Sequence, residues 1–404
     1  MRSCATALCF LCLFTACQQW ADDAWSEPAV AITAPVAAGS RYPSLASGPE
    51  GTAVMSWLSP TKGDAYQLLH ASWTGSGWTP PVTVSTGADW FVNWADFASV
   101  VPAGADLWAA HWLQQRPGSV YAYDVRIALS HDRGRTWSAP MSPHDDGTAT
   151  EHGFVSMLGD RGQLQAIWLD GRKTGGGHDH GSGHGAMTLR TATVDDAGRL
   201  SGGGTELDAR VCDCCQTDAA LTSEGPVVVY RDRDENEIRD IAIVRSSPAG
   251  WSAPQSLHRD GWRIAGCPVN GPAVAASDRR VAVAWFTAPD VPRVRLAFSE
   301  DAGRSFGAPL EVAAGRIAGR VDVVLLDDDR AVVSWLADDP GGAEIRVQAW
   351  TSSGPDGPVV VVARSSADRA SGFPRMIRAG DALLFAWTEA STVPLVRTAI
   401  IRLR

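Results

Sequence analysis

Four cysteines in the middle of the chain are the residues whose types and spacing are best suited to chemistry. Cys212, Cys214 and Cys215 form a Cys-x-Cys-Cys cluster, and Cys267 follows at a distance. Thiolates in this pattern can supply three or four sulfur ligands to Zn or Cu(I). They can also form disulfides, for which four cysteines allow three pairings, or a redox-active thiol pair. Because a bond between the neighbours Cys214 and Cys215 is strained, a disulfide between Cys267 and one cysteine of the cluster is expected instead.

The elements that must position these cysteines come from one repeat, used about seven times. One phrase is an aromatic residue followed by proline, as in Trp137–Pro140 and Trp251–Pro254. A second phrase is a short apolar run that ends in an aromatic residue, as in Val227–Tyr230 and Val281–Trp285. Both phrases recur about every 50–60 residues, with alternating, strand-like segments between them and no sustained helical periodicity.

Four short strands per repeat predict an all-β fold, a β-propeller of four-stranded antiparallel blades. The count favours seven blades, with six as the alternative. The last repeat, Phe373–Arg404, has room for only three strands. We therefore expect Trp25–Ile32 to supply the missing strand and close the ring, which removes exposed sheet edges.

In such a fold, the loops that lead into the innermost strands open onto one face at the axis. These loops carry Asn93–Asp96, Glu151 with His152, Cys212–Gln216 and Gly266–Asn270. Polar groups from non-adjacent loops that point one way predict a functional site. The two cysteine loops precede inner strands of consecutive blades, so we expect the four cysteines to meet near the axis.

Two turns carry a recognisable motif. Ser130–Trp137 fits the Asp-box pattern Ser-x-Asp-x-Gly-x-Thr-Trp, and Ser299–Phe306 is a close second copy. The aspartate can accept hydrogen bonds from the turn backbone, and the glycine supplies the strained turn conformation. Over nearly its whole length the chain resembles the sialidase-like Asp-box (BNR-repeat) β-propeller superfamily. Within that superfamily it resembles an exo-α-sialidase-like bacterial lipoprotein. The box implies the fold more strongly than the activity, because in that family it lies away from the substrate.

The resemblance implies a carboxylate-binding clamp. Sialidases of this kind are glycoside hydrolases that hold the sugar carboxylate with three arginines. Arg41, Arg231 and Arg293 match these arginines, with Arg295 as an alternative to Arg293, and Glu389 matches the glutamate that steadies the first. Three guanidiniums converging on one carboxylate form charge-assisted hydrogen bonds. The expected ligand is therefore an acidic glycan or another carboxylated molecule.

The catalytic residues of the family are less well matched. The nucleophilic tyrosine falls at Phe373, which has no nucleophilic oxygen, and its partner glutamate falls in the stretch Cys212–Thr217. The family's acid/base aspartate could be Asp64 or Asp96. Hydrolysis would then need a carboxylate such as Glu151 or Asp96, because two carboxyl groups carry the usual glycosidase chemistry.

Charge and the N-terminus restrict partners and location. The 404-residue chain has a net charge of −10, which argues against nucleic acid as a partner. Arg2 and an apolar run up to Cys17 resemble a bacterial lipoprotein signal: residues 1–16 would be the signal peptide, Cys17 the lipidated residue and residues 17–24 a linker before a propeller at 25–404. An ordinary secretory signal is the alternative. No later segment is apolar over the length needed to span a membrane.

These observations favour an exported, lipid-anchored monomer of the bacterial cell envelope, facing the periplasm or the cell surface. It is expected to recognise or hydrolyse acidic glycans at the axial face. The alternatives are a metal-binding or redox lipoprotein that uses the four cysteines, with Zn or Cu as the metal, and a scaffold that binds another envelope protein.

Overall fold

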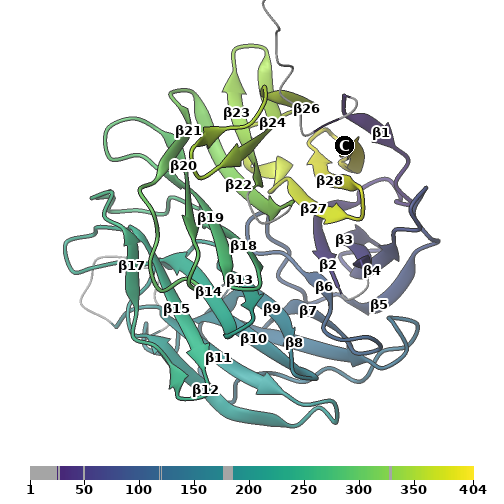
Figure 1. Cartoon of the computed structure of the whole chain (residues 1–404). Coiled ribbons are helices and arrows are strands. Elements are labelled where there is room, and N and C mark those ends of the chain that lie inside the picture. Colours follow the sequence, from purple (N-terminus) through teal and green to yellow (C-terminus); the bar gives the residue numbers. More distant parts are fainter. Residues whose placement is uncertain are drawn as a thin grey trace, which may run out of the picture.

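The computed structural model describes Trp25 and residues 28–48, 51–117, 119, 121–175, 185–326 and 330–404. Within these residues seven β-sheets stand around a central axis (Figure 1). The prediction of a seven-bladed propeller is confirmed, and the six-bladed alternative is wrong. The described residues contain no helix that is long and apolar enough to cross a membrane. The segment 1–16, Cys17 and the linker 17–24 lie outside the described residues.

The blades are numbered here in chain order, and the first strand of each lines the axis. Blade 1 contains β2 (Arg41–Ser47), β3 (Ala53–Pro60), β4 (Tyr66–Ser72) and β5 (Val82–Gly87). Blade 2 contains β6 (Ser99–Pro102), β7 (Trp108–Gln115) and β8 (Tyr123–Ser130). Blade 3 contains β9 (His152–Asp160), β10 (Gln163–Asp170), β11 (Thr188–Val194) and β12 (Leu200–Asp208). Blade 4 contains β13 (Asp218–Thr222), β14 (Gly225–Arg231), β15 (Ile241–Ser247), β16 (Gly250–Trp251) and β17 (Gln255–His258).

The remaining blades follow the same plan. Blade 5 contains β18 (Ala273–Ser277), β19 (Arg280–Thr287), β20 (Arg293–Ser299) and β21 (Leu310–Ala314). Blade 6 contains β22 (Ile317–Leu325), β23 (Ala331–Asp339), β24 (Gly342–Thr351), β25 (Gly354–Pro355) and β26 (Val360–Ser365). The 3₁₀ turn η2 (Arg369–Ser371) precedes blade 7, which contains β27 (Arg375–Ala379), β28 (Ala382–Glu389), β29 (Leu395–Arg402) and β1 (Val30–Ile32).

The ring is closed by the N-terminal strand, as predicted. β1 pairs antiparallel with β29, with Val30 opposite Ile400, and Trp25 forms a further bridge to Leu403. The last blade is therefore built from both ends of the described chain. Blade 2 departs from the predicted four strands, since in the described residues its outer position holds only the bridge between Ile127 and Met141. Pro140 and Pro143 flank Met141, and proline cannot donate to a strand ladder.

The tryptophan-rich composition is explained by packing between blades. The chain has 17 tryptophans, and the second strand of each blade carries one aromatic residue at an equivalent, buried position. These residues are Trp57, Trp112, Trp168, Tyr230, Trp285, Trp335 and Trp387. Each second strand is buried on both sides, and large rings fill the wedge between neighbouring sheets.

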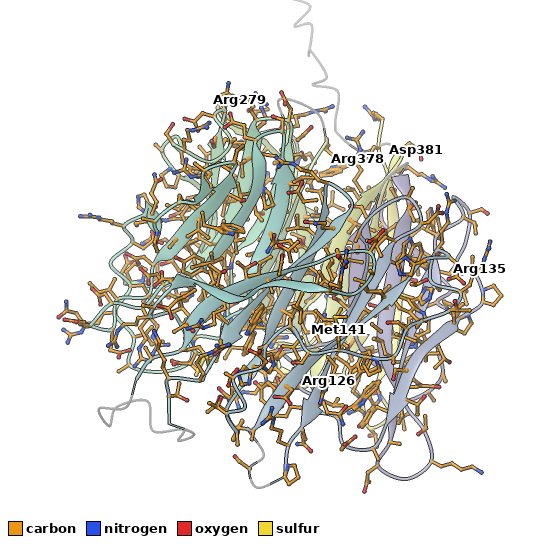
Figure 2. The ribbon with its side chains drawn as sticks, turned by 90° about the horizontal axis from the view of Figure 1, so that it is seen from below. Arg126, Arg135, Met141, Arg279, Arg378 and Asp381 are labelled. Atoms are coloured by element: carbon orange, nitrogen blue, oxygen red, sulfur yellow. A yellow bond between two sulfur atoms is a disulfide. The ribbon has the colours of Figure 1, made fainter. Side chains whose placement is uncertain are left out.

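The side of the propeller on which the inner strands begin is called the loop face here, and the opposite side is called the turn face. Seen edge-on, Arg279, Arg378 and Asp381 mark turns that follow inner strands, and all lie on one side (Figure 2). At the loop face, non-glycine residues adopt the left-handed region, with φ of 53° at Tyr42, 51° at Phe154, 46° at Val269 and 52° at Arg320. This conformation costs about 1–2 kcal/mol per residue, and such strain is commonly found at functional sites.

Side chains of one blade hold these strained backbones in the next. Asp96 Oδ1 accepts a hydrogen bond from Phe154 N at 2.7 Å, and Thr388 Oγ1 accepts one from Tyr42 N at 2.8 Å. Asn270 Oδ1 accepts one from Arg320 N at 2.7 Å. The loop face is therefore a rigid platform, fixed by hydrogen bonds between neighbouring blades.

Candidate functional site

Glu151, Asp96 and Tyr123 come together on the loop face between blades 2 and 3. Glu151 immediately precedes β9 and forms a parallel bridge with Tyr123 at the start of β8. The Tyr123 hydroxyl donates to Asp96 Oδ2 at 3.3 Å. A Cβ atom on Gly153 would lie 2.0 Å from Asp96 Oδ2 and 2.9 Å from the Tyr123 ring. Only glycine therefore allows β9 to approach these two side chains so closely.

This environment favours the protonated form of both carboxyl groups. Burial raises the pKa of Glu151 to about 8, and the neighbouring carboxylates of Asp96 and Asp213 add to the rise. Burial also raises the pKa of Asp96 to about 7, although hydrogen bonds from Phe154 N–H and the Tyr123 hydroxyl act in the opposite direction. Burial and the charge of Asp96 raise the pKa of Tyr123 well above its ordinary value, so its hydroxyl remains a donor. Near neutral pH the site holds at least one proton for transfer.

A carboxylate paired with arginine lies beside this group. Asp213 Oδ2 is 2.9 Å from Arg233 Nη1 and 3.6 Å from Arg239 Nη1, and all three side chains are at most 10% exposed. Glu237 pairs with both arginines, at 2.7 and 2.9 Å. The arrangement places a proton-bearing carboxyl, Glu151, near an ion-paired carboxylate, Asp213. Two carboxyl groups in such different environments can take different roles, one as a proton donor and the other as a carboxylate.

A buried histidine fixes the backbone that carries Glu151 and Tyr123. His152 Nδ1 lies 3.2 Å from the carbonyl oxygens of both Tyr123 and Thr150, and its Nε2 lies 3.1 Å from Asp146 Oδ2. These contacts of the His152 ring tie the two segments of the site together.

The same region contains a group of potential metal ligands, Asp124, His144 and His152. The two imidazole rings are stacked, with centroids 3.9 Å apart. His144 Nε2 accepts a hydrogen bond from Val125 N, and Asp124 is held by Arg116 at 2.7 Å. Burial, followed by the charge of His152, lowers the pKa of His144 to about 4. Val125 N–H already occupies His144 Nε2, and both nitrogens of His152 face protein oxygen atoms. These two rings therefore fit a polar network better than a metal centre, although Asp124 Oδ1 is buried without a hydrogen-bond partner among the described residues.

The four cysteines meet on the loop face in two disulfides. Cys212 pairs with Cys215 and Cys214 pairs with Cys267, with Cα–Cα distances of 5.8 and 5.9 Å. Cys212 and Cys215 are 1% exposed, whereas Cys267 is exposed. Sulfur in a disulfide cannot serve as a thiolate ligand, so this arrangement leaves no thiolate among the four for Zn or Cu. The bonds instead fix the loop that carries Asp213 to the neighbouring blade.

Replacing Cys214 and Cys267 together by alanine is expected to lower the free energy of unfolding by about 2–4 kcal/mol, because their bond closes a loop of 53 residues. Urea denaturation of the oxidised proteins measures this difference. Wild-type protein treated with a reductant serves as the comparison and should be destabilised at least as much. An unchanged midpoint in the double variant would show that this bond does not stabilise the fold.

The structure does not bring the three predicted clamp arginines together. Arg231 is 1% exposed, and its nitrogens donate to the backbone carbonyl oxygens of Asn270, Arg239 and Phe286 at 2.6–3.0 Å. Arg293, the first residue of β20, instead pairs with Asp290 in the preceding turn and with Glu311 on β21. The expectation of a three-arginine clamp is therefore wrong, because the guanidinium of Arg231 is committed to backbone carbonyl groups inside the fold.

The remaining predicted residues are also separated. Arg41 opens β2, and its Nε donates to Gly39 O at 3.2 Å. Glu389 pairs with Arg397 at 2.7 Å, and no described contact joins it to Arg41. Asp64 is exposed in the turn between β3 and β4, with no described contact to Asp96 or Glu151. Of the catalytic candidates, the structure unites only Asp96 and Glu151.

The loop of residues 93–97 covers the axis. The Trp94 ring stacks on Phe373 with centroids 5.9 Å apart, and Gln216 Nε2 donates to Ala95 O at 2.7 Å. Phe373 is 5% exposed, and its ring packs against Trp94. The guanidinium of Arg320 lies over both rings, 5.2 Å from Trp94 and 5.7 Å from Phe373. Contacts from three blades therefore close the axis at the loop face.

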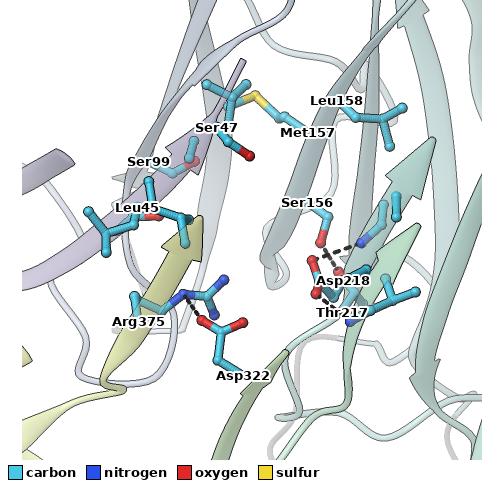
Figure 3. Close-up of a pocket in the computed structure, with 18 of the residues that line it drawn as sticks. Leu45, Ser47, Ser99, Ser156, Met157, Leu158, Thr217, Asp218, Asp322 and Arg375 are labelled. Atoms are coloured by element: carbon cyan, nitrogen blue, oxygen red, sulfur yellow. Dashed lines mark hydrogen bonds and ion pairs between the residues drawn. The ribbon is translucent and has the colours of Figure 1, made fainter. Parts of the chain in front are cut away.

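A cavity of about 690 Å³ lies below this cover, lined by the inner strands of all seven blades. Figure 3 shows its charged groups: Arg375 on β27 and Asp322 on β22 form an ion pair of 3.3 Å, and Asp218 on β13 faces them. Ser156 Oγ and Thr217 Oγ1 share a hydrogen bond of 2.8 Å on the same wall. The cavity wall thus combines charged and hydroxyl groups with apolar side chains.

Sequence reasoning missed several residues of these sites. Tyr123 lies in a strand-like segment, and no local pattern distinguishes it from other strand tyrosines. Arg375 begins β27 and Asp322 lies within β22, where alternation alone predicts only that they face the axis or the neighbouring blade. Asp213 lay within the cysteine cluster, and its pairing with Arg233 depends on a contact between two loops.

No family model matches this chain. No curated protein matches it either. Among solved structures, a protein of unknown function from Dyadobacter fermentans is 14% identical, with 93% of this chain and 98% of that chain covered and a TM-score of 0.50. An α-L-arabinofuranosidase from Fusarium graminearum, in complex with an iminosugar inhibitor, is 12% identical, with 94% and 98% covered and a TM-score of 0.50. A Hadza microbial sialidase is 14% identical, with 74% and 63% covered and a TM-score of 0.45. The first two likenesses establish a common fold.

Proposed function

We propose that this propeller acts on carbohydrate at its loop face, as a glycoside hydrolase in which Glu151 is the proton donor. The observation that carries the proposal is the pairing of a carboxyl whose pKa is raised to about 8 with the ion-paired carboxylate of Asp213 nearby. Glycoside hydrolysis needs such a pair: one carboxyl protonates the leaving oxygen, and a carboxylate stabilises or attacks the sugar cation.

The chain's own groups divide this work. Glu151 is partly accessible and holds the proton to be donated. Asp96 is 3% exposed, and both its oxygens accept hydrogen bonds from the protein, so it acts through Glu151 as a positioning residue. Arg233 pairs with Asp213 at 2.9 Å and holds that carboxylate in place beside Glu151. Strained, rigid backbone on this face supports precise placement of these groups.

The shared fold supports carbohydrate as the general substrate class, since one similar propeller is an α-L-arabinofuranosidase. A fold alone does not determine a reaction, so the choice of hydrolysis rests on the carboxyl groups of the site. Incubating the purified protein with a panel of natural oligosaccharides and aryl glycosides tests the proposal. Release of free sugar from at least one of them, lost in a Glu151 variant, is expected. No release and no binding across the panel would overturn it.

Recognition of an acidic sugar is a narrower form of the proposal, and it rests on Arg41. The described hydrogen bond of Arg41 uses Nε alone, at the start of β2 on the loop face. Arg41→Ala is expected to weaken binding of carboxylated sugars at least about 10-fold, because one charge-assisted hydrogen bond contributes about 1.5–3 kcal/mol. Calorimetric titration measures this, with Arg293→Ala as the matched control, since Arg293 already pairs with Asp290 and Glu311. Equal affinities for wild type and Arg41→Ala would exclude this role.

Export and anchoring through Cys17 complete the proposal. A lipid-anchored hydrolase would meet glycans in the envelope rather than inside the cell. Mass spectrometry of protein extracted from membranes tests this directly. An N-terminal diacylglyceryl-modified Cys17 is expected, and an unmodified terminus elsewhere would indicate an ordinary secreted protein.

A further inference from the structure

The axial cavity beneath the loop of residues 93–97 has a charge pattern that the proposed reaction does not use. Its volume of about 690 Å³ falls in the range of small-molecule sites, about 300–1,000 Å³. Residues at one end, such as Ala95 and Asp96, are buried, while Ser47, Leu221 and Ser277 at the other end are exposed. The cavity therefore opens on the turn face, opposite Glu151.

The guanidinium of Arg375 points into this space with unused donors. Its Nε lies 3.3 Å from Asp322 Oδ2. Among the described residues, neither of its terminal nitrogens has a hydrogen-bond partner. Figure 3 shows this side chain facing the strand that carries Asp218 across the cavity. A guanidinium fork with both ends free can hold two oxygen atoms of a ligand at once.

Acceptors surround this fork on rigid strands. Asp322 accepts hydrogen bonds from Val323 N and Met376 N, both at 2.9 Å, and Asp218 accepts from Val274 N at 2.8 Å. These bonds hold Asp322 against its own strand and β27, and they hold Asp218 against β18. Each carboxylate oxygen still has a second lone-pair direction available, so both groups can accept from a ligand as well.

The charges of the cavity select against a charged ligand. Burial raises the pKa of Asp218 to about 6 and also raises that of Asp322, although Arg375 lowers both. An anion would meet the carboxyl oxygens of Asp96, Asp218 and Asp322. A cation would meet the free end of Arg375. A pair of neighbouring hydroxyl groups suits both the guanidinium and the carboxyl groups of the cavity. Each hydroxyl oxygen can accept a hydrogen bond from Arg375, and each hydroxyl group can donate one to Asp218 or Asp322.

We propose that the axial cavity is a second binding site, for a neutral polyhydroxylated molecule of about monosaccharide size held between Arg375, Asp218 and Asp322. The site is separate from the Glu151 site and does not depend on hydrolysis. Because Arg375 and Asp218 begin β27 and β13, the site lies inside the axis, below the cover formed by the loop of residues 93–97, and it is entered from the turn face.

Glucose, glucosamine and glucuronate provide matched probes, because they share one ring and differ in charge. Titration calorimetry with the full chain is expected to detect glucose, with glucuronate and glucosamine each bound at least about 10-fold more weakly. Arg375→Gln and Asp218→Asn should each weaken glucose binding at least about 10-fold, since each removes charge-assisted hydrogen bonds. Arg316→Gln, which changes an exposed arginine paired with Asp338, should leave it unchanged.

Several outcomes would overturn this site. They are the absence of glucose binding at millimolar concentration, tighter binding of either charged probe, and glucose binding that neither cavity variant weakens. Circular dichroism and thermal unfolding show whether Arg375→Gln remains folded. If it does not, glucose binding by Asp218→Asn decides whether the cavity is the binding site. Glu151→Gln separates the two sites: it should leave calorimetric binding at the cavity unchanged, whether or not the protein hydrolyses any glycoside.

Discussion

Glu151→Gln is expected to lower kcat/KM on the preferred glycoside by about 10²–10⁴-fold, the usual contribution of a general acid. The amide keeps the shape of the protonated carboxyl but cannot give up a proton. Steady-state kinetics on the substrate found in the panel measure the loss. Glu300→Gln is the matched control: Glu300 is exposed and pairs with Arg280 at the start of β19, and this change should leave kcat/KM unaltered.

The pH dependence follows from the same group. Glu151 must be protonated to donate, and its pKa is raised to about 8. Wild-type activity is therefore expected to fall as the pH rises through about 8, and this limb should be absent from the residual activity of Glu151→Gln. A wild-type profile that stays flat to pH 10 would contradict the role of Glu151 as the acid.

The free energy of unfolding should also fall as the pH rises. The folded-state pKa of Glu151 is raised, so the folded protein binds its proton more tightly than the unfolded chain. Its contribution to stability is full below its unfolded pKa and is lost as the pH rises through about 8. Glu151→Gln should lose less stability than wild type between pH 5 and pH 8. This result would also show that any loss of activity does not come from unfolding.

Arg231→Met is expected to lower the free energy of unfolding by about 3–5 kcal/mol, the second large effect. The substitution would leave the buried carbonyl oxygens of Asn270, Arg239 and Phe286 without their donor. Each unsatisfied buried acceptor costs about 1–3 kcal/mol. Urea denaturation gives the value. Arg293→Met, at an exposed ion pair, should stay within about 0.5 kcal/mol of wild type.

This comparison separates two roles for Arg231. A clamp arginine at a solvent-filled axis would lose ligand affinity on substitution and keep its stability. A structural arginine would lose stability first. If Arg231→Met unfolds with the wild-type midpoint and binds carboxylated sugars more weakly, the clamp implied by the sialidase resemblance would be restored.

Repetition made the fold predictable from the sequence. The apolar run that ends in an aromatic residue marks the second strand of each blade, and Trp57, Trp168 and Trp285 occupy equivalent buried positions. The short last repeat predicted that the segment before Ile32 would join it, and β1 does so. Hydrophobic patterning repeated at a fixed interval determines which face of each strand is buried, and this determines the architecture.

The site was less predictable, because it depends on contacts between loops. Position along the chain matched Arg231 to a family arginine, but its role depends on which buried carbonyl groups surround it. Asp96 and Glu151 were singled out as loop residues, whereas their shared contact with Tyr123 arises only when blades 2 and 3 pack. Raised pKa values result from burial and neighbouring charge, and neither can be inferred from spacing.

The most direct test of the account is the dependence of Glu151→Gln on the leaving group. A general acid is needed when the leaving oxygen is basic and is dispensable when it is not. Rates should be measured on a dinitrophenyl glycoside and on an alkyl glycoside of the same sugar. The account predicts near wild-type hydrolysis of the dinitrophenyl substrate by Glu151→Gln, with the loss of about 10²–10⁴-fold confined to the alkyl substrate. An equal loss on both substrates would contradict proton donation by Glu151.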